Sequence, residues 1–224
     1  MYRRFAIYVT PEGDLGRVGA AWLGWDILAG RSVEHPVPVG IDCARITKRP
    51  RKYGLHATVK PPMALRDGAT PEALESAAGQ IAKDIAPLEL SGLEVSQIRG
   101  FLALTPRGDT RELDRLASIV VAQLDRFRTP PSSEELARRR KRRLTVSQEA
   151  NLTRWGYPHV MEDYRFHITL TGPLKDADQL RPVVAAHFAP VLSEPFVIDH
   201  LSIAGEAEDG MFHRIARLPL GGKD

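Results

Sequence analysis

Two segments of this sequence carry the same residue types in the same order. Residues 53–62 read YGLHATVKPP, and residues 164–173 read YRFHITLTGP. A tyrosine, a histidine, a threonine and a proline coincide, and the positions between them are mostly apolar in both copies. Each copy has a threonine two residues after its histidine. An imidazole and a hydroxyl at this spacing could act together on one phosphate group.

The four residues concerned are His56 and Thr58 in the first copy and His167 and Thr169 in the second. The unperturbed pKa of histidine is about 6.5, so one neutral imidazole can take a proton while a second, protonated imidazole gives one. The threonine hydroxyls can donate to nonbridging phosphate oxygens, where negative charge builds. The set suits cleavage of a phosphodiester, with His56 and His167 as the catalytic residues.

Both copies alternate polar and apolar residues, which predicts two β-strands, the second over residues 165–171. Residues two apart on a strand share a face, so Lys60 is expected beside Thr58. Thr171 is expected beside Thr169 for the same reason. A basic side chain next to the motif would add positive charge for the phosphate. We therefore expect a phosphate-binding group made of Thr58, Thr169, Lys60, Thr171 and Arg165.

A single histidine–x–threonine pattern is a weak signal, because it arises by chance and usually marks a satisfied core or surface residue. Two copies in matching contexts are much harder to attribute to chance. Neither copy has a second histidine or a carboxylate at ligand spacing, so no metal site is predicted. The one cysteine, Cys43, excludes an internal disulfide. No cofactor is expected.

The two segments resemble the motifs of the two-histidine (2H) phosphoesterase superfamily. The longer stretch around the second motif, residues 154–172, reads RWGYPHVMEDYRFHITLTG. Together with residues 53–62 it resembles the branch encoded beside phosphonate-degradation (carbon–phosphorus lyase) genes. The resemblance covers nearly the whole chain.

This resemblance implies an α+β fold with two pseudo-symmetric lobes, each a mostly antiparallel sheet packed with helices, around a central cleft. It implies metal-independent catalysis by His56 and His167, with the phosphate held by Thr58 and Thr169. The implied substrate is a cyclic phosphodiester, such as the cyclic ribose phosphate formed by carbon–phosphorus lyase, with a functional link to phosphonate-degradation enzymes. Which histidine is the acid and which is the base stays open.

The rest of the chain alternates irregularly between predicted helices and strands, which favours an α+β arrangement with antiparallel sheets. Each repeated segment is followed by a predicted helix and two strands, so residues 1–224 are interpreted as one bilobal domain. A helix is predicted over residues 15–28, and another begins at Pro71 with Thr70 as its N-cap. Residues 129–150 form a basic insert.

The bulk properties are those of an ordinary globular protein. Of 224 residues, 43% are hydrophobic and 26% are charged, and the formal net charge is +3. This mildly basic balance permits a phosphate-bearing ligand without requiring one. No apolar run is long enough to cross a membrane, and the N-terminal run lacks the features of a signal peptide. A cytoplasmic protein without a membrane partner is expected.

Within the insert, residues 138–143 read RRRKRR. Such a run is usually a solvated helix face, and the functional interpretation is a flap that attracts an anionic ligand or contacts RNA phosphates. Three aromatic residues near the motifs, Tyr53, Trp155 and Tyr157, could contact the substrate, and core packing is the alternative for each.

Three functions are consistent with these observations. The first and favoured one is a phosphodiesterase that acts on a small cyclic phosphate. The second is a module that binds RNA or a phosphorylated ligand without turnover. The third is a non-catalytic accessory of a phosphonate-degrading complex. The duplicated histidine is what favours the enzyme.

Overall fold

The computed structural model describes residues 1–36, 40–141, 143–192 and 194–222. One seven-stranded sheet runs through the molecule, and every neighbouring pair of its strands is antiparallel. Its strands, in order across the sheet, are β11 (Phe212–Pro219), β10 (His200–Glu206), β1 (Phe5–Val9), β4 (Ala57–Met63), β8 (Ile168–Thr169), β7 (Phe101–Arg107) and β6 (Gly92–Ile98).

Two short sheets accompany the large one. β2 (Trp25–Asp26) pairs with β3 (Arg31–Ser32), and β5 (Leu88–Leu90) pairs with β9 (Phe196–Ile198). The helices are α1 (Gly13–Leu23), α2 (Cys43–Ile46), α3 (Pro71–Lys83), α4 (Arg111–Gln123), α5 (Ser133–Arg140), α6 (Val146–Trp155) and α7 (Ala177–Phe188). Single 3₁₀ turns cover Arg51–Tyr53, Asp125–Phe127, Met161–Asp163 and Ala189–Val191.

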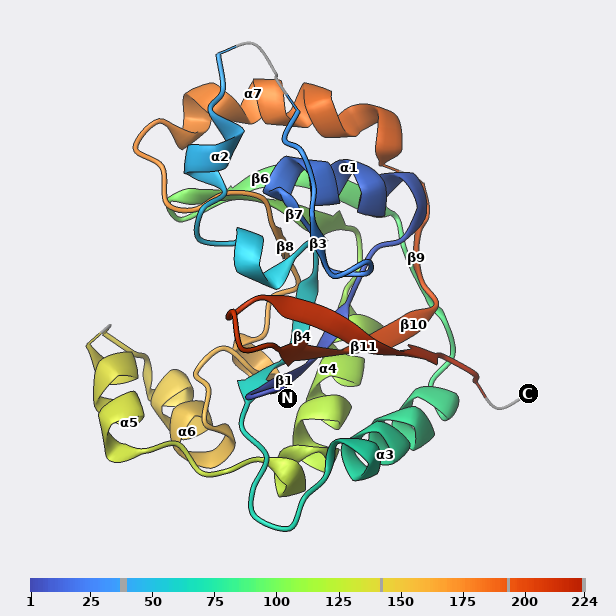
Figure 1. Ribbon diagram of the computed structural model, residues 1–224, viewed down its shortest axis with the longest axis vertical. Coiled ribbons are helices and arrows are strands. Elements are labelled where there is room, and N and C mark those ends of the chain that lie inside the picture. Colours follow the sequence, from blue (N-terminus) through green and yellow to red (C-terminus); the bar gives the residue numbers. More distant parts are fainter. Residues whose placement is uncertain (37–39, 142, 193, 223–224) are drawn as a thin grey trace.

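The four long helices α1, α3, α4 and α7 cover one face of the sheet. Apolar side chains from all four share one core with the strands, for example Leu74 of α3, Leu116 of α4 and Phe188 of α7. Figure 1 shows α1 and α7 at one end of the molecule and α3 and α4 at the other. A smaller core, which includes Tyr8 and Phe212, lies on the opposite face of the sheet.

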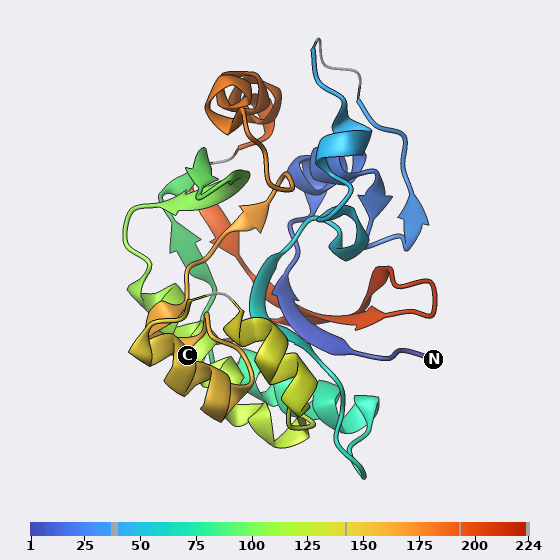
Figure 2. The same ribbon diagram turned by 90° about the vertical axis from the view of Figure 1, so that its left-hand side faces the viewer.

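The basic insert forms α5 and the first part of α6. These two helices lie side by side (Figures 1 and 2), and Figure 1 shows them away from α1, α3 and α7. Helix α5 has no buried residue, so its position does not depend on core packing of its own side chains. Arg142, within the basic run, lies outside the described residues.

The predicted α+β class with antiparallel strands is confirmed. The strands of the two halves also meet edge to edge, because β4 pairs with β8. The N-cap of α3 is confirmed as well: the Thr70 hydroxyl accepts a hydrogen bond from the Ala73 amide, and Pro71 is the first helical residue.

Two predicted elements are shorter than expected. The helix over 15–28 ends at Leu23, because Gly24 adopts a left-handed conformation (φ 77°) and its amide satisfies helix carbonyls. The strand over 165–171 is reduced to β8, because the amides of Leu170 and Thr171 both donate to the carbonyl of Leu102, which interrupts the regular ladder.

Candidate active site

The register between β4 and β8 places the two motifs side by side. Ala57 is the antiparallel partner of Ile168. Continuing this register by one residue in each direction sets His56 opposite Thr169, and the same step sets Thr58 opposite His167. Ala57 and Ile168 pack in the large core. Because side chains alternate along strands, the four neighbouring groups lie on the opposite face of the sheet. The two imidazoles and two hydroxyls therefore form one group.

Each imidazole is oriented by the same local hydrogen bond. Nδ1 of His56 lies 3.0 Å from the carbonyl oxygen of Gly54, and Nδ1 of His167 lies 2.8 Å from that of Arg165. A carbonyl only accepts, so Nδ1 carries the proton in both rings. Nε2 is then the nitrogen left for chemistry. In the first copy it lies 3.2 Å from Oγ1 of Thr58.

The surroundings of the two histidines differ. The ring of His56 is half-buried, with the Tyr8 ring centroid at 3.9 Å and that of Tyr53 at 5.9 Å. Burial lowers the pKa of His56 to about 4, the hydrogen bond to Gly54 opposes this, and the charge of His167 lowers the pKa further. His56 is therefore neutral at pH 7, and His167 is close enough to influence the ionisation of His56.

The prediction that Lys60 lies beside Thr58 is wrong. Tyr8 pairs with Thr58 while Ile7 pairs with Lys60, so β4 has one extra residue at this point. This bulge turns Lys60 to the face of Ile7, which belongs to the large core. Its ammonium is buried and donates to the carbonyl of Val121 (3.1 Å) and to Asp125 (3.4 Å). Burial lowers the pKa of Lys60 to about 8.

The expected role of Thr171 also does not fit the structure, whereas that of Arg165 stays a prediction. Thr171 is 1% exposed, and its hydroxyl accepts a hydrogen bond from the Leu102 amide at 2.9 Å. It holds the edge of β7 and does not lie at the surface. The guanidinium of Arg165 is exposed and donates to the carbonyls of Glu162 and Tyr164, so it closes its own loop.

The three aromatic residues take different positions. Tyr53 lies against His56 and also contacts Phe212, with ring centroids 5.0 Å apart. Trp155 and Tyr157 line a pocket of about 370 Å³ beside β4, together with Arg4. Tyr53 is thus near the histidines, whereas Trp155 and Tyr157 form part of a neighbouring wall.

Tyr8 is a site residue that the sequence did not reveal. It is fully buried and its hydroxyl has no hydrogen-bond partner among the described residues. Burial raises the pKa of this phenol well above its ordinary value. The only sequence signal is a polar-tipped ring inside the apolar run of β1, which packing explains equally well. On the side of the second histidine, the ring centroids of Phe101 and His167 are 5.9 Å apart.

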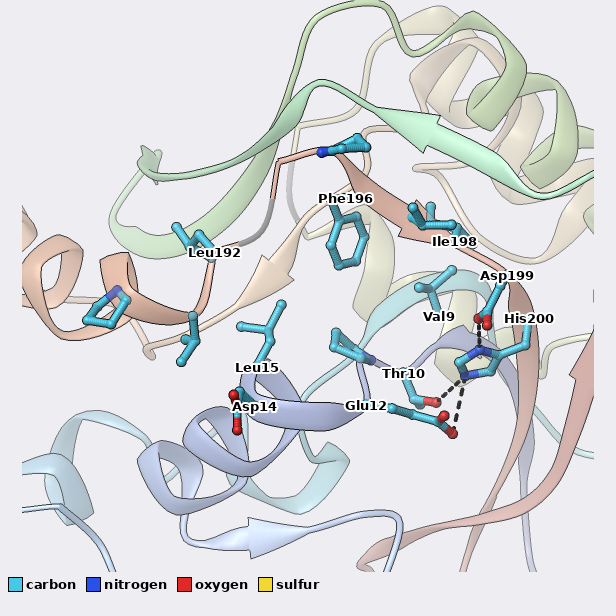
Figure 3. Close-up of a pocket in the computed structure, with 15 residues that line it drawn as sticks. Val9, Thr10, Glu12, Asp14, Leu15, Leu192, Phe196, Ile198, Asp199 and His200 are labelled. Carbon is cyan, nitrogen blue, oxygen red and sulfur yellow. Dashed lines mark hydrogen bonds and ion pairs between the residues drawn. The ribbon is translucent and has the colours of Figure 1, made fainter.

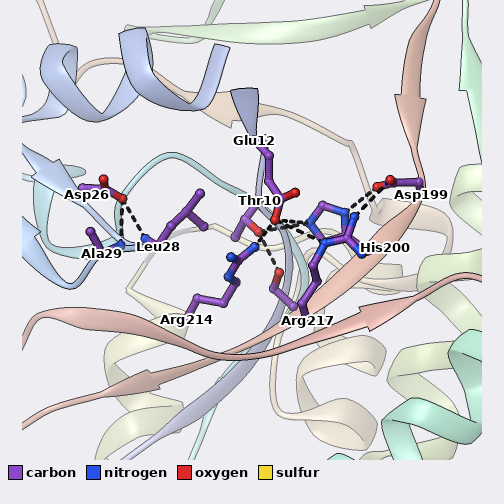
Figure 4. Close-up of polar contacts among 10 residues, drawn as sticks. Thr10, Glu12, Asp26, Leu28, Ala29, Asp199, His200, Arg214 and Arg217 are labelled. Atoms are coloured by element: carbon purple, nitrogen blue, oxygen red, sulfur yellow. Dashed lines mark hydrogen bonds and ion pairs between the residues drawn. The ribbon is translucent and has the colours of Figure 1, made fainter. Parts of the chain in front are cut away.

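A second polar cluster lies away from the paired histidines, beside a pocket of about 490 Å³ (Figure 3). Nδ1 of His200 lies 2.5 Å from Asp199, and its Nε2 lies 3.5 Å from the hydroxyl of Thr10. Glu12, which follows β1, forms ion pairs with Arg214 and Arg217 of β11 (Figure 4). These contacts tie the start of α1 to the edge of the sheet.

Within the described ranges, no group of three or more histidine, cysteine or carboxylate side chains is arranged to hold a metal ion. In the same part of the chain, no helix combines the length and apolar character that a membrane crossing requires.

Comparison with known families identifies the chain. Residues 58–213 match the family described as "Protein of unknown function (DUF1045)", and the chain belongs to this family. It is 36% identical over 232 residues to the "Ribose 1,5-bisphosphate phosphokinase PhnN" of Janthinobacterium sp. (strain Marseille) and 33% identical over 221 residues to the protein of that name from Laribacter hongkongensis (strain HLHK9). These alignments cover 98% and 96% of this chain but 51% of each relative, so the chain spans about half their length.

Several solved structures are also similar. They include E. coli LigT complexed with 3′-AMP (13% identity, TM-score 0.49, 99% of each chain covered) and TT0787 of Thermus thermophilus (15% identity, TM-score 0.48, 99% of this chain and 100% of that one). Another is named a phosphoesterase (16% identity, TM-score 0.46, 99% of each chain covered).

Proposed function

We propose that this chain is a 2H-type phosphodiesterase that hydrolyses a small cyclic phosphodiester without a metal ion. The observation that carries the proposal is the group formed by His56, Thr58, His167 and Thr169 across β4 and β8. Both imidazoles present Nε2, because the same type of backbone hydrogen bond holds Nδ1 in each copy. Two imidazoles and two hydroxyls on one sheet face match the needs of phosphodiester cleavage.

The proposed reaction uses water as the nucleophile. His56 is the base: its Nε2 takes a proton from water as the water oxygen bonds to phosphorus. The bond from phosphorus to one ester oxygen breaks, and Nε2–H of His167 gives that oxygen a proton. Thr58 and Thr169 donate to the nonbridging oxygens. The assignment of His56 as base rests on its burial against Tyr8, which keeps it neutral.

The proposed substrate class is a cyclic ribose phosphate of phosphonate breakdown. Its support is the name of the two relatives, a ribose 1,5-bisphosphate phosphokinase, although the chain matches only about half of each. The resemblance of both motifs to the branch encoded beside phosphonate-degradation genes points the same way. A cytoplasmic location would follow from such a role.

The test is a product screen read by phosphorus NMR. Purified protein is incubated with cyclic ribose phosphates, 2′,3′-cyclic nucleotides and short RNAs, with and without a chelator. We expect ring opening of a cyclic phosphate that is unaffected by the chelator. His56→Ala or His167→Ala should lower kcat by about 10²–10⁴-fold or more, whereas the control His187→Ala on α7 should not.

The two other functions predict different outcomes. A binding module would retain a phosphorylated ligand but release no product. An accessory protein would bind a phosphonate-degrading complex with both histidines replaced. Full activity of either histidine variant would contradict the proposed mechanism.

A further inference from the structure

Two pockets along the basic helix α5 share a wall. The first, of about 370 Å³, includes Arg4, and the second, of about 210 Å³, includes Arg99. Arg138, Arg139 and Tyr157 line both pockets. One side of the basic helix α5 therefore lines both pockets.

Residues of both pockets lie near side chains that contact the paired histidines. Tyr157 and Arg4 are both near enough to Tyr8 to influence its ionisation, and the Tyr8 ring lies against that of His56. On the other side, Arg99 precedes by two residues Phe101, whose ring contacts His167. Arg99 stands at the turn between β6 and β7 with φ of 54°, a conformation that is uncommon for a residue other than glycine.

The smaller pocket has an excess of positive charge. Four arginines and His159 line it, and no acidic side chain does. Arg139 is neutralised by an ion pair with Glu135. Among the described residues, no acidic partner is found for Arg99, Arg138 or Arg143. Guanidinium groups gathered without counter-charges repel one another, and their planar donors match the oxygens of a phosphate.

Two aromatic rings of these pockets each have a guanidinium over one face, which leaves fewer faces for stacking on nucleobases. The guanidinium of Arg139 covers the ring of Tyr157 at 4.8 Å from its centroid, and that of Arg154 covers the ring of Trp155 at 4.6 Å. Binding of single-stranded RNA relies on free aromatic faces for successive bases. A phosphate group fits this wall better than a nucleobase does.

We infer that Arg99, Arg138 and Arg143 form a second anion site, which holds a phosphate group of the substrate other than the one that reacts. The inference rests on the proposed function and narrows its substrate to a small cyclic phosphodiester that carries an additional phosphate monoester. The site would orient the ring toward His56 and His167.

The experiment compares two substrates that differ only in the second phosphate. A ribose cyclic phosphate is tested with a phosphate on its primary hydroxyl and with that hydroxyl free. For the wild-type chain we expect kcat/KM to be larger for the phosphorylated form by about 10²-fold, because charge-assisted hydrogen bonds from two arginines each contribute about tenfold. The double variant R138Q/R143Q should reduce this ratio to near one.

The matched control is Arg140→Gln. It removes one positive charge from α5, the helix that carries Arg138, but Arg140 forms an ion pair with Glu149 at 2.6 Å and lines neither pocket. Its substrate ratio should stay at the wild-type value. Arg138 and Arg143 are exposed, so circular dichroism should show all variants folded.

Other outcomes separate the two proposals. Equal rates on both ribose substrates would overturn the second anion site and leave the phosphodiesterase intact. No turnover of any cyclic phosphate would overturn the phosphodiesterase itself. A strong preference for RNA ending in a cyclic phosphate, lost in the double variant, would show that the arginines bind an RNA backbone. That result would contradict the proposal that the substrate is a small molecule.

Discussion

At the scale of single residues, the two histidines have the same orientation but different surroundings. A carbonyl two residues earlier accepts from Nδ1 in each case. His56, however, lies against Tyr8 and Tyr53, while Phe101 is the ring near His167. Apolar surroundings penalise the imidazolium, so burial distinguishes His56 from His167 although the same motif carries both residues.

The low pKa of His56 predicts a pH dependence of stability. Its pKa is about 4 in the folded chain and about 6.5 in the unfolded chain, so between these pH values the unfolded chain binds more protons than the folded chain. This contribution is complete above pH 6.5 and is lost as pH falls toward 4. Between pH 7 and pH 5, the wild-type chain should lose about 2 kcal/mol more unfolding free energy than His56→Gln. Urea titrations at both pH values measure this, and equal losses would contradict it.

The same pKa predicts the acidic limb of the rate profile. If His56 is the base, kcat/KM for a cyclic substrate should fall only below about pH 4, where the imidazole becomes protonated. If His56 were the acid, kcat/KM would instead rise as pH falls toward 4. Initial rates between pH 4 and pH 8, on protein shown to be folded, distinguish the two assignments.

At the scale of elements, the bulge in β4 decides which side chains join the site. Strict alternation predicts one face for His56, Thr58 and Lys60. One extra residue in the strand moves Lys60 to the opposite face. There its ammonium donates to the carbonyl of Val121, in the last turn of α4, and to the carboxylate of Asp125, just after that helix. The site therefore contains the threonine of the motif but not the lysine.

This arrangement predicts that Lys60 is dispensable for catalysis. Lys60→Met should keep kcat/KM within about twofold and change the unfolding free energy by about 1 kcal/mol, because Asp125 keeps its ion pair with Arg128 (2.8 Å). Thr58→Val is the matched comparison on the same strand and should lower kcat by about 10²-fold. A folded Lys60→Met chain without activity would show that the lysine contacts the substrate.

At the scale of the whole molecule, corresponding elements of the two repeats pair with each other. The motif strands β4 and β8 are neighbours, and so are β5 and β9, each of which follows a motif strand and its helix. Such pairing is what an approximate two-fold relation between the repeats produces. The junction of the halves is also where the two histidines meet.

The shared sheet predicts cooperative unfolding of the segments that follow the two motifs. Both segments contribute residues to the large core: Leu74 and Leu102 follow the first motif, and Val184 and Ile203 follow the second. Separate melting would expose this core, so urea unfolding should be two-state. Far-UV circular dichroism and tryptophan fluorescence should give the same midpoint, and two distinct midpoints would indicate independently stable lobes.

The sequence by itself determined the features that depend on local spacing. The motif positions, the antiparallel α+β class and the cap of α3 all follow from neighbouring residues, because capping and strand alternation are short-range effects. Two matching motifs were also sufficient to nominate His56 and His167.

The tertiary structure alone decided which groups come together. The pairing of β4 with β8, the bulge that removes Lys60, and the enclosure of Thr171 depend on register between distant strands. The burial that separates His56 from His167 depends on Tyr8, a residue of another strand. Register and burial are set by packing over the whole chain, so no local pattern around either histidine contains them.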